Sequence, residues 1–162
     1  MKAMLINGSP RKNGNTSELV RIFNDRIEDK VDIDTISIFE MDIKGCTNCG
    51  ACQKNVLVSH CTVKDDMSSL YDMFIGSDLI ILASPIYMWQ MTPCTLAFLN
   101  RLHCLCQSSD FKYNEMAGKK MILLLTMGAE KEVADFAVNG MKEFCEFFSI
   151  DYLGDVRAEF AD

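Results

Sequence analysis

The sequence lacks any long apolar segment, and it has too few basic residues to balance its acidic ones. Its 162 residues include 16 Lys and Arg against 23 Asp and Glu, which gives a formal net charge of −7. No apolar run approaches the roughly 18 residues of a membrane-spanning helix, and the N-terminus has a strand pattern rather than that of a signal peptide. Nucleic acid and membranes are therefore excluded as expected partners. We expect one cytoplasmic domain over residues 1–162.

The sequence also lacks the two most familiar nucleotide-binding motifs. No G-x-G-x-x-G dinucleotide fingerprint is present. Gly8 and Gly14 are one residue too far apart for a nucleoside-triphosphate loop, and Asn15 stands where that loop needs Lys. A low-molecular-weight tyrosine phosphatase is excluded as well, because the loop Gly8–Ser17 contains no Cys for the C-x5-R motif of such an enzyme.

The residues that do stand here form a polar turn between a short apolar run, Met4 to Ile6, and an amphipathic segment that begins near Asn15. A strand that ends in such a turn and then opens a helix presents backbone N–H groups at the positive end of the helix dipole, which suits a phosphate. Neutral donors with a single guanidinium favour one monophosphate bound without Mg²⁺; the alternative is a polar turn with no ligand. The candidate phosphate ligands are Ser9, Arg11, Asn13, Asn15, Thr16 and Ser17.

Apolar periodicity predicts five strands that alternate with helices. The expected strands cover residues 2–7, 31–39, 78–83, 120–126 and 152–160, and the expected helices cover residues 16–28, 67–75, 93–106 and 133–148. Such alternation is typical of a parallel α/β sheet with helices on both faces and right-handed crossovers. A cofactor in such a sheet lies at the carboxyl ends of the strands, where the winding reverses, so we expect loops 8–17 and 84–92 to share one site.

Three loops carry a resemblance to a known family. Gly8-Ser9-Pro10-Arg11, followed by Gly14-Asn15-Thr16, resembles the FMN phosphate loop of the NAD(P)H-dependent FMN reductase and iron–sulfur flavoprotein group of the flavodoxin-like superfamily. Ser84-Pro85-Ile86-Tyr87-Met88-Trp89 resembles that group's S-P-I-Y-W stretch, which lies along the flavin ring, and Thr126-Met127-Gly128 resembles its third flavin loop. The resemblance implies FMN as cofactor, with the flavin carrying the chemistry and no catalytic side chain. The implied ring contacts are Pro85, Ile86, Tyr87, Met88, Trp89, Thr126 and Gly128.

The same resemblance implies a flavodoxin-like three-layer sandwich with a five-stranded parallel sheet in the order 2-1-3-4-5. Chains of that superfamily usually finish with a fifth helix, and the pattern after the last expected strand lacks one. One face of the sheet near its edge would then be bare. We therefore expect a partner subunit to cover this surface in a homodimer or a higher homo-oligomer.

The eight cysteines are expected to be thiols, metal ligands or redox groups rather than disulfides. Four of them form a C-x2-C-x2-C-x8-C motif in a cysteine-rich insertion at about 44–64. Three thiolates at i, i+3 and i+6 can wrap one inorganic cluster, and the resemblance to iron–sulfur flavoproteins implies a 4Fe–4S cluster on Cys46, Cys49, Cys52 and Cys61. Zinc on four thiolates, or on three with His60, stays open. So does a redox dithiol of Cys46 and Cys49, or a set of bare thiols.

Phe98-Leu99-Asn100-Arg101 resembles the F-x-D-R stretch of the same group, with Asn100 in place of the acid. We expect Arg101 to have a structural or interface role rather than a catalytic one.

The resulting expectation is an FMN-dependent oxidoreductase. Electrons would pass from NAD(P)H or a ferredoxin-like donor to the flavin, and then to a small-molecule acceptor or to the cluster. The alternative is a non-catalytic FMN-binding module, or a redox sensor based on thiols or a metal. Steady oxidation of NAD(P)H with any acceptor would favour the enzyme.

Overall fold

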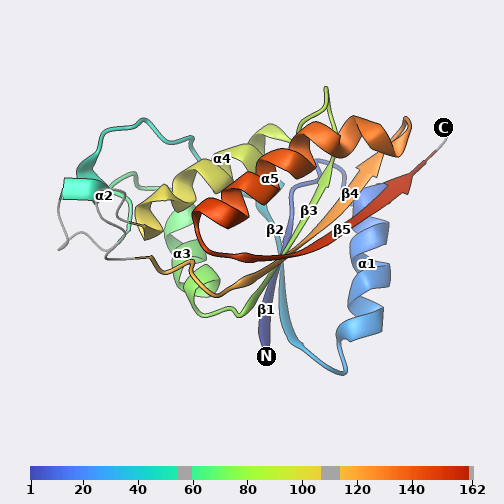
Figure 1. Ribbon diagram of the computed structural model, residues 1–162, viewed down its shortest axis with the longest axis horizontal. Helices are drawn as coiled ribbons and strands as arrows, with labels where there is room; N and C mark the ends of the chain where they lie inside the picture. The colour runs from blue at the N-terminus through green and yellow to red at the C-terminus, as the bar shows by residue number, and fades with distance from the viewer. Residues whose placement is uncertain (55–59, 107–113, 161–162) are drawn as a thin grey trace.

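The centre of the molecule is a parallel sheet of five strands, seen in a computed structural model that describes residues 1–54, 60–106 and 114–160 (Figure 1). The strands are β1 (Lys2–Asn7), β2 (Asp32–Ser37), β3 (Leu79–Pro85), β4 (Lys120–Met127) and β5 (Asp151–Glu159). Their order is β2-β1-β3-β4-β5, and every neighbouring pair is parallel. The predicted fold class and strand order are thus confirmed. Residues 55–59 of the expected insertion lie outside the described residues.

Helices cover both faces of this sheet (Figure 1). α1 (Asn15–Ile27) lies on one face, and α3 (Met67–Ile75), α4 (Pro93–Arg101) and α5 (Asp135–Phe147) lie on the other. A short helix, α2 (Ala51–Lys54), belongs to the cysteine-rich segment. The described 3-10 turns are η1 (Ile38–Glu40), η2 (Leu102–Leu105) and η3 (Lys131–Ala134). None of the helices that the structure describes is long and apolar enough to cross a membrane.

The prediction of a missing fifth helix is wrong, because the described residues contain five α-helices. The helix that sequence reasoning missed is α2, which lies between β2 and α3. Its four residues make about one turn, which is too short for an apolar repeat to become visible in a sequence. The predicted helix over 93–106 is divided into α4 and the turn η2.

Two apolar cores form because successive residues of a strand point to opposite faces of the sheet. Leu5 and Ile81 belong to the core beneath α1, together with Val20 of that helix. Ile6 and Leu82, their neighbours in sequence, belong to the core on the other face. β3 is buried along its whole length, as expected for the central strand of a parallel sheet.

The edge strand β5 is covered less completely. Val156 is in register with Leu124 of β4, which belongs to the core on the α1 face, yet 43% of Val156 is exposed. Leu153 on the same strand is 55% exposed. β5 therefore carries an apolar strip, Leu153 and Val156, that is open to solvent.

Candidate functional site

The carboxyl ends of β1, β3 and β4 meet at one edge of the sheet, because neighbouring parallel strands end side by side. Asn7 is in register with Ala83, and Pro85 is in register with Thr126. The hydroxyls of Thr126 and Thr16 share a buried hydrogen bond of 2.7 Å, which joins the end of β4 to the first turn of α1. The first and third predicted loops are thus in direct contact.

The start of α1 presents backbone N–H groups that have no acceptor within the helix. Gly14 is the N-cap, and the first intrahelical bond runs from the Glu18 N–H to the Gly14 carbonyl at 3.0 Å. The amides of residues 15–17 precede that bond. They are the donors that a helix start offers to an anion, at the positive end of its dipole.

Side chains of the first loop hold its shape from within. Asn7 Oδ1 accepts the Ser9 N–H at 2.9 Å, and Ser9 Oγ accepts the Arg11 N–H at 3.2 Å. Ser17 Oγ donates to the Arg11 carbonyl at 3.0 Å. Ser9 and Thr16 are buried, and their hydroxyls make hydrogen bonds within the protein. The predicted ligands with exposed side chains are Arg11, Asn13 and Asn15.

Gly8 approaches the start of α4 more closely than a larger residue could. A Cβ at position 8 would lie 1.9 Å from Oγ1 of Thr95. Thr92 Oγ1 donates to the Gly8 carbonyl at 2.8 Å and also shares a 2.8 Å hydrogen bond with Thr95 Oγ1. Sequence reasoning missed both threonines. Thr92 before Pro93 does mark a helix start, but nothing in the sequence shows that this helix packs against the first loop.

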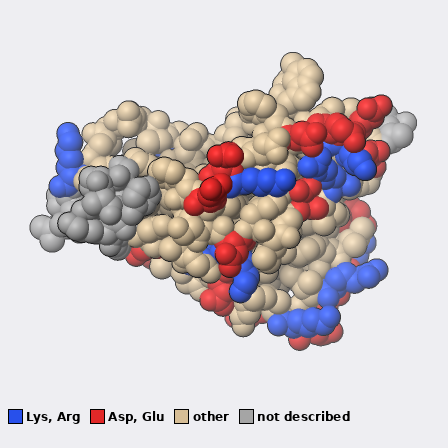
Figure 2. Space-filling view, in the orientation of Figure 1, with Lys and Arg blue, Asp and Glu red and all other residues tan. Residues whose placement is uncertain are grey.

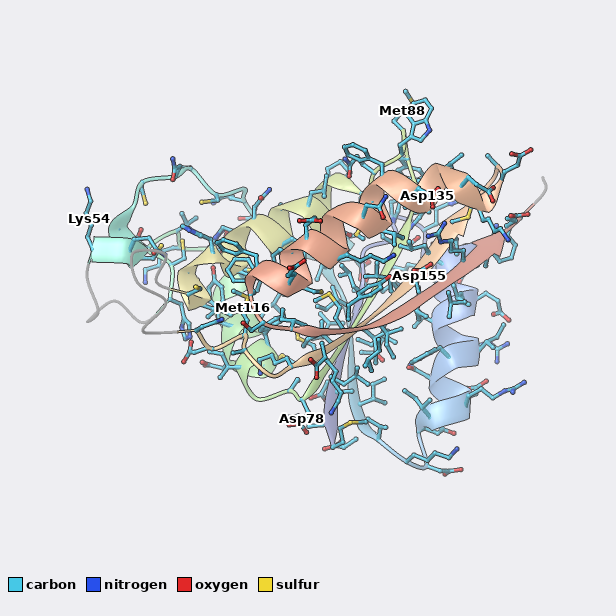
Figure 3. The ribbon with its side chains drawn as sticks, viewed as in Figure 1. Lys54, Asp78, Met88, Met116, Asp135 and Asp155 are labelled. Carbon is cyan, nitrogen blue, oxygen red and sulfur yellow. The ribbon has the colours of Figure 1, made fainter. Side chains whose placement is uncertain are left out.

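The second loop projects from the molecule as a tight hairpin turn. The Tyr87 N–H donates to the Gln90 carbonyl at 2.8 Å, and the Gln90 N–H donates to the Tyr87 carbonyl at 3.0 Å. Met88 and Trp89, which lie between these two residues, have backbone φ angles of 49° and 64°. Residues other than glycine rarely adopt such positive φ angles. Met88 is 80% exposed and Trp89 is 56% exposed. Figure 3 labels Met88 at the tip, and in Figure 2 this projection carries no charged residue.

A cavity of about 200 Å³ lies between the second and third loops. Its lining is largely apolar and contains the indole of Trp89, so its chemistry suits a flat aromatic ring. Four of the predicted ring contacts share this cavity, whereas Pro85, Tyr87 and Thr126 are adjacent in sequence without lining it. The lining residues are Ile86, Met88, Trp89, Met127, Gly128, Ala129 and Val133.

The four motif cysteines, Cys46, Cys49, Cys52 and Cys61, line one small cavity of about 20 Å³. The first two are exposed and the other two are half-buried. The space holds about one water molecule. Among residues 1–54, 60–106 and 114–160, no group of three or more His, Cys, Asp or Glu is placed to hold a metal ion. The donor set fits a thiolate-bound metal in its chemistry, and binding would need the sulfur atoms to move.

The charges of these thiols influence one another. Burial raises the pKa of the Cys52 thiol, and negative charge on the other three motif cysteines raises it further. The Ala51 N–H and the Thr62 hydroxyl instead lower the pKa of Cys49, whose sulfur is 3.9 Å from Thr62 Oγ1. The charged forms of these thiols therefore repel one another within the shared cavity.

The three loops belong to a chain that matches a known protein family. Residues 1–151 match the family model described as NADPH-dependent FMN reductase. The chain belongs to this family. The assignment confirms the resemblance predicted from the three loops.

Curated relatives of this FMN reductase family member are named iron–sulfur flavoproteins. One from Archaeoglobus fulgidus is 35% identical over 103 residues, which are 63% of this chain and 46% of the relative. One from Methanosarcina thermophila is 33% identical over 89 residues, which are 54% of this chain and 45% of the relative. The matched part is thus less than half of either relative's length.

A solved structure confirms the flavodoxin-like fold of this family member. An FMN-dependent NADH-azoreductase from Bacillus anthracis, in complex with FMN, superposes with a TM-score of 0.76. The match covers 98% of this chain and 87% of the azoreductase at 14% sequence identity. At that identity the likeness shows the fold alone, and the individual site residues stay predictions.

Proposed function

We propose that this chain is an FMN-dependent oxidoreductase whose FMN binds where β1, β3 and β4 end. The proposal rests on two features that lie at the carboxyl end of the sheet, the start of α1 and the cavity beside Trp89. The amides at the start of α1 suit a phosphate, and the apolar cavity beside Trp89 suits a flat ring. FMN consists of such a ring and a phosphate joined by a flexible chain, and the family description names FMN.

The first loop would bind the phosphate. The amides of residues 15–17 supply neutral donors, and the exposed guanidinium of Arg11 supplies positive charge. The exposed amide side chains of Asn13 and Asn15 add further donors. Ser9, Thr16 and Ser17 act indirectly, because their hydroxyls are used to hold the loop and α1 in place.

The second and third loops would hold the ring. Ile86, Met88 and Trp89 line the cavity together with Gly128, which has no side chain to obstruct the ring. Thr126 fixes this third loop to α1 through Thr16, which keeps the ring site in register with the phosphate site. The chemistry that FMN supplies when bound is the transfer of a hydride or of single electrons. No side-chain acid or base is needed for it.

We propose NAD(P)H or a ferredoxin-like protein as the donor and a small molecule as the acceptor. The cavity opens beside the exposed Met88–Trp89 turn, which leaves room for a second small molecule to reach the ring. A non-catalytic FMN-binding or redox-sensing module is the second candidate. The exposed thiols of Cys46 and Cys49 favour it, because exposed thiols can be oxidised or metallated.

For the cysteine segment we propose a 4Fe–4S cluster on Cys46, Cys49, Cys52 and Cys61. Support comes from their common cavity and from the names of the curated relatives. When bound, such a cluster supplies single-electron transfer. Zinc, a redox dithiol or bare thiols at the same residues would contradict this part of the proposal only.

We also infer that residues 1–162 form a single FMN-binding domain in the cytoplasm, with residues 44–64 as an insertion. All eight cysteines are free, which fits a reducing compartment. A second copy of the chain would cover the apolar strip of Leu153 and Val156 on β5.

One sample tests the cofactors together. Protein purified without oxygen should show flavin absorption bands, a broad iron–sulfur shoulder and about four irons per chain. Trp89 is the single tryptophan, so adding FMN to flavin-free protein should quench its fluorescence. NADH and NADPH oxidation with ferricyanide as acceptor then measures turnover. No flavin binding would refute the FMN site, and flavin without iron would refute the cluster alone. Flavin without turnover by NADH, NADPH or a reduced ferredoxin would favour the sensor.

A further inference from the structure

The cysteine segment, residues 44–64, begins and ends at the same place. The Asp42 N–H donates to Asp66 Oδ2 at 2.8 Å, and the Asp66 N–H donates back to the Asp42 carbonyl at 3.1 Å. One step further in, the Lys44 N–H donates to Asp65 Oδ2 at 3.0 Å. The incoming and outgoing chains are thus hydrogen-bonded to each other before the cysteines are reached.

Arg101, the last residue of α4, joins the two ends of the segment. Its guanidinium binds both carboxylate oxygens of Asp65, with Nη1 2.6 Å from Oδ2 and Nη2 3.1 Å from Oδ1. Nη1 also donates to the Lys44 carbonyl at 2.8 Å, and Nη2 donates to the Val63 carbonyl at 3.4 Å. The Arg101 side chain therefore binds Lys44 and Val63, at the two ends of the segment, and Asp65 just beyond it.

Both partners of this pair are fully buried, with side-chain exposures of 0%. Burial opposes their charged forms, but the hydrogen bonds between them prevail: the pKa of Asp65 is lowered and that of Arg101 is raised. A buried ion pair adds little net stability compared with an apolar pair of similar volume. What the pair provides is a fixed geometry, because the planar fork of Arg satisfies a carboxylate and two carbonyls at once and Lys cannot do so.

The same helix touches the first loop at its other end. Thr92, the N-cap of α4, donates to the Gly8 carbonyl, and the nine residues from Pro93 to Arg101 span about 13 Å. In Figure 1, α4 runs from the side of the hairpin turn toward α2. At its C-terminal end, α4 is hydrogen-bonded to the cysteine segment through Arg101.

We propose that Arg101 is a positioning residue for the cysteine segment, which holds the four motif cysteines toward their common cavity and so makes a bound metal or cluster possible. Its role in metal retention rests on the cluster proposed above; its role in closing the segment does not. FMN binding should not depend on it, because the contacts between α4 and the first loop lie at the opposite end of the helix.

Arg101→Met tests the proposal, with Arg101→Lys and Asp65→Asn as milder variants. Arg157→Met is the matched control. Arg157 is likewise an ion-paired arginine, bound to the carboxylates of Asp155 and Asp135, which Figure 3 places far from Lys54 of α2. Each protein is reconstituted with FMN, ferrous iron and sulfide without oxygen. The readouts are iron per chain, FMN per chain and amide hydrogen exchange.

In Arg101→Met we expect iron per chain to fall by more than half and the amides of Asp42 and Lys44 to exchange at least tenfold faster. FMN per chain and exchange in β1, β3 and β4 should match the wild type. Arg101→Lys should be intermediate, and Arg157→Met should leave both the iron and the Lys44 amide unchanged. If Arg101→Met does not fold, Asp65→Asn decides by the same criteria.

Unchanged iron and unchanged exchange at residues 42–44 would overturn the proposal. So would a loss of FMN and of sheet protection together with the iron, since that pattern means a general loss of stability. Wild-type protein that binds FMN but no iron refutes the cluster, and the exchange rates at Asp42 and Lys44 then still decide whether Arg101 closes the segment.

Discussion

At the scale of single residues, Gly8 is the position where the candidate FMN site tolerates least change. A Cβ there would overlap with Oγ1 of Thr95 at 1.9 Å, and the hydroxyl of Thr92 would be 3.1 Å away. We predict that Gly8→Ala lowers the free energy of unfolding by about 1–3 kcal/mol, as overpacking does, and weakens FMN binding at least tenfold. Urea unfolding and FMN titration measure the two effects.

Thr95→Ala provides the control for this prediction. It removes the overlapping oxygen, so Gly8→Ala combined with Thr95→Ala should be more stable than Gly8→Ala alone. If the stability losses of the two single variants simply add in the double variant, the contact between the first loop and α4 does not cause the loss in Gly8→Ala.

A second residue-scale prediction concerns acid stability through Asp155. Burial raises the pKa of Asp155, but Tyr152 Oη at 2.7 Å and Arg157 Nε at 2.6 Å outweigh it, so the pKa is lowered. A carboxyl with a lowered pKa stabilises the fold fully above its unfolded pKa, near pH 4, and loses that contribution as the pH falls through its folded value. Between about pH 4 and pH 2, wild type should therefore lose more stability than Asp155→Asn. Thermal unfolding across this range measures the difference, and parallel curves would contradict the assignment.

At the scale of elements, the Met88–Trp89 turn combines backbone strain with a wall of the cavity. Both residues have positive φ, where Asn and Gly are the favoured residues of a two-residue hairpin turn. We predict that Met88→Asn with Trp89→Gly raises the free energy of unfolding by about 1–2 kcal/mol. The same change should weaken FMN binding, because the indole leaves the cavity.

Met88→Asn alone is the matched control, since it relieves one strained position and keeps Trp89. Urea unfolding and calorimetric titration with FMN separate the two effects. Tighter FMN binding in the double variant would contradict the assignment of Trp89 to the ring site.

Elements with long apolar patterns could be predicted from the sequence, and contacts between elements could not. β3 reads as a strand buried on both faces because Leu79 to Leu82 are all apolar, and the structure buries the whole strand. α2 was missed because one helical turn has no visible repeat. Arg101 was expected to be structural, but its partner Asp65 lies 36 residues away and no spacing rule connects them. Thr92 and Thr95 were missed for the same reason.

At the scale of the whole molecule, the apolar strip on β5 is the surface that we expect a second copy to cover. Leu153 and Val156 are 55% and 43% exposed on an edge strand, so a second copy packed against them would remove apolar surface from water. We predict a dimer or higher oligomer by light scattering. Leu153→Lys with Val156→Lys should yield monomers that still bind FMN.

Lys substitutions at two other exposed apolar residues, Phe136 and Phe147 of α5, serve as the control, because they add the same charge on the opposite face of the sheet. A wild-type monomer would refute the prediction outright. Dissociation by the α5 variants alone would move the interface to that helix.

The hydrogen bonds between Asp42 and Asp66 have a consequence for how such a chain can change. Because these two residues are hydrogen-bonded to each other, the chain between them is a loop whose ends already lie together. A short turn could rejoin the ends if that loop were removed. Arg101 would have to become apolar in the same step, since it would lose Asp65. The four thiols can therefore be gained or lost together without redesign of the sheet, provided that the surfaces which Cys52, Gln53 and His60 cover are refilled as well.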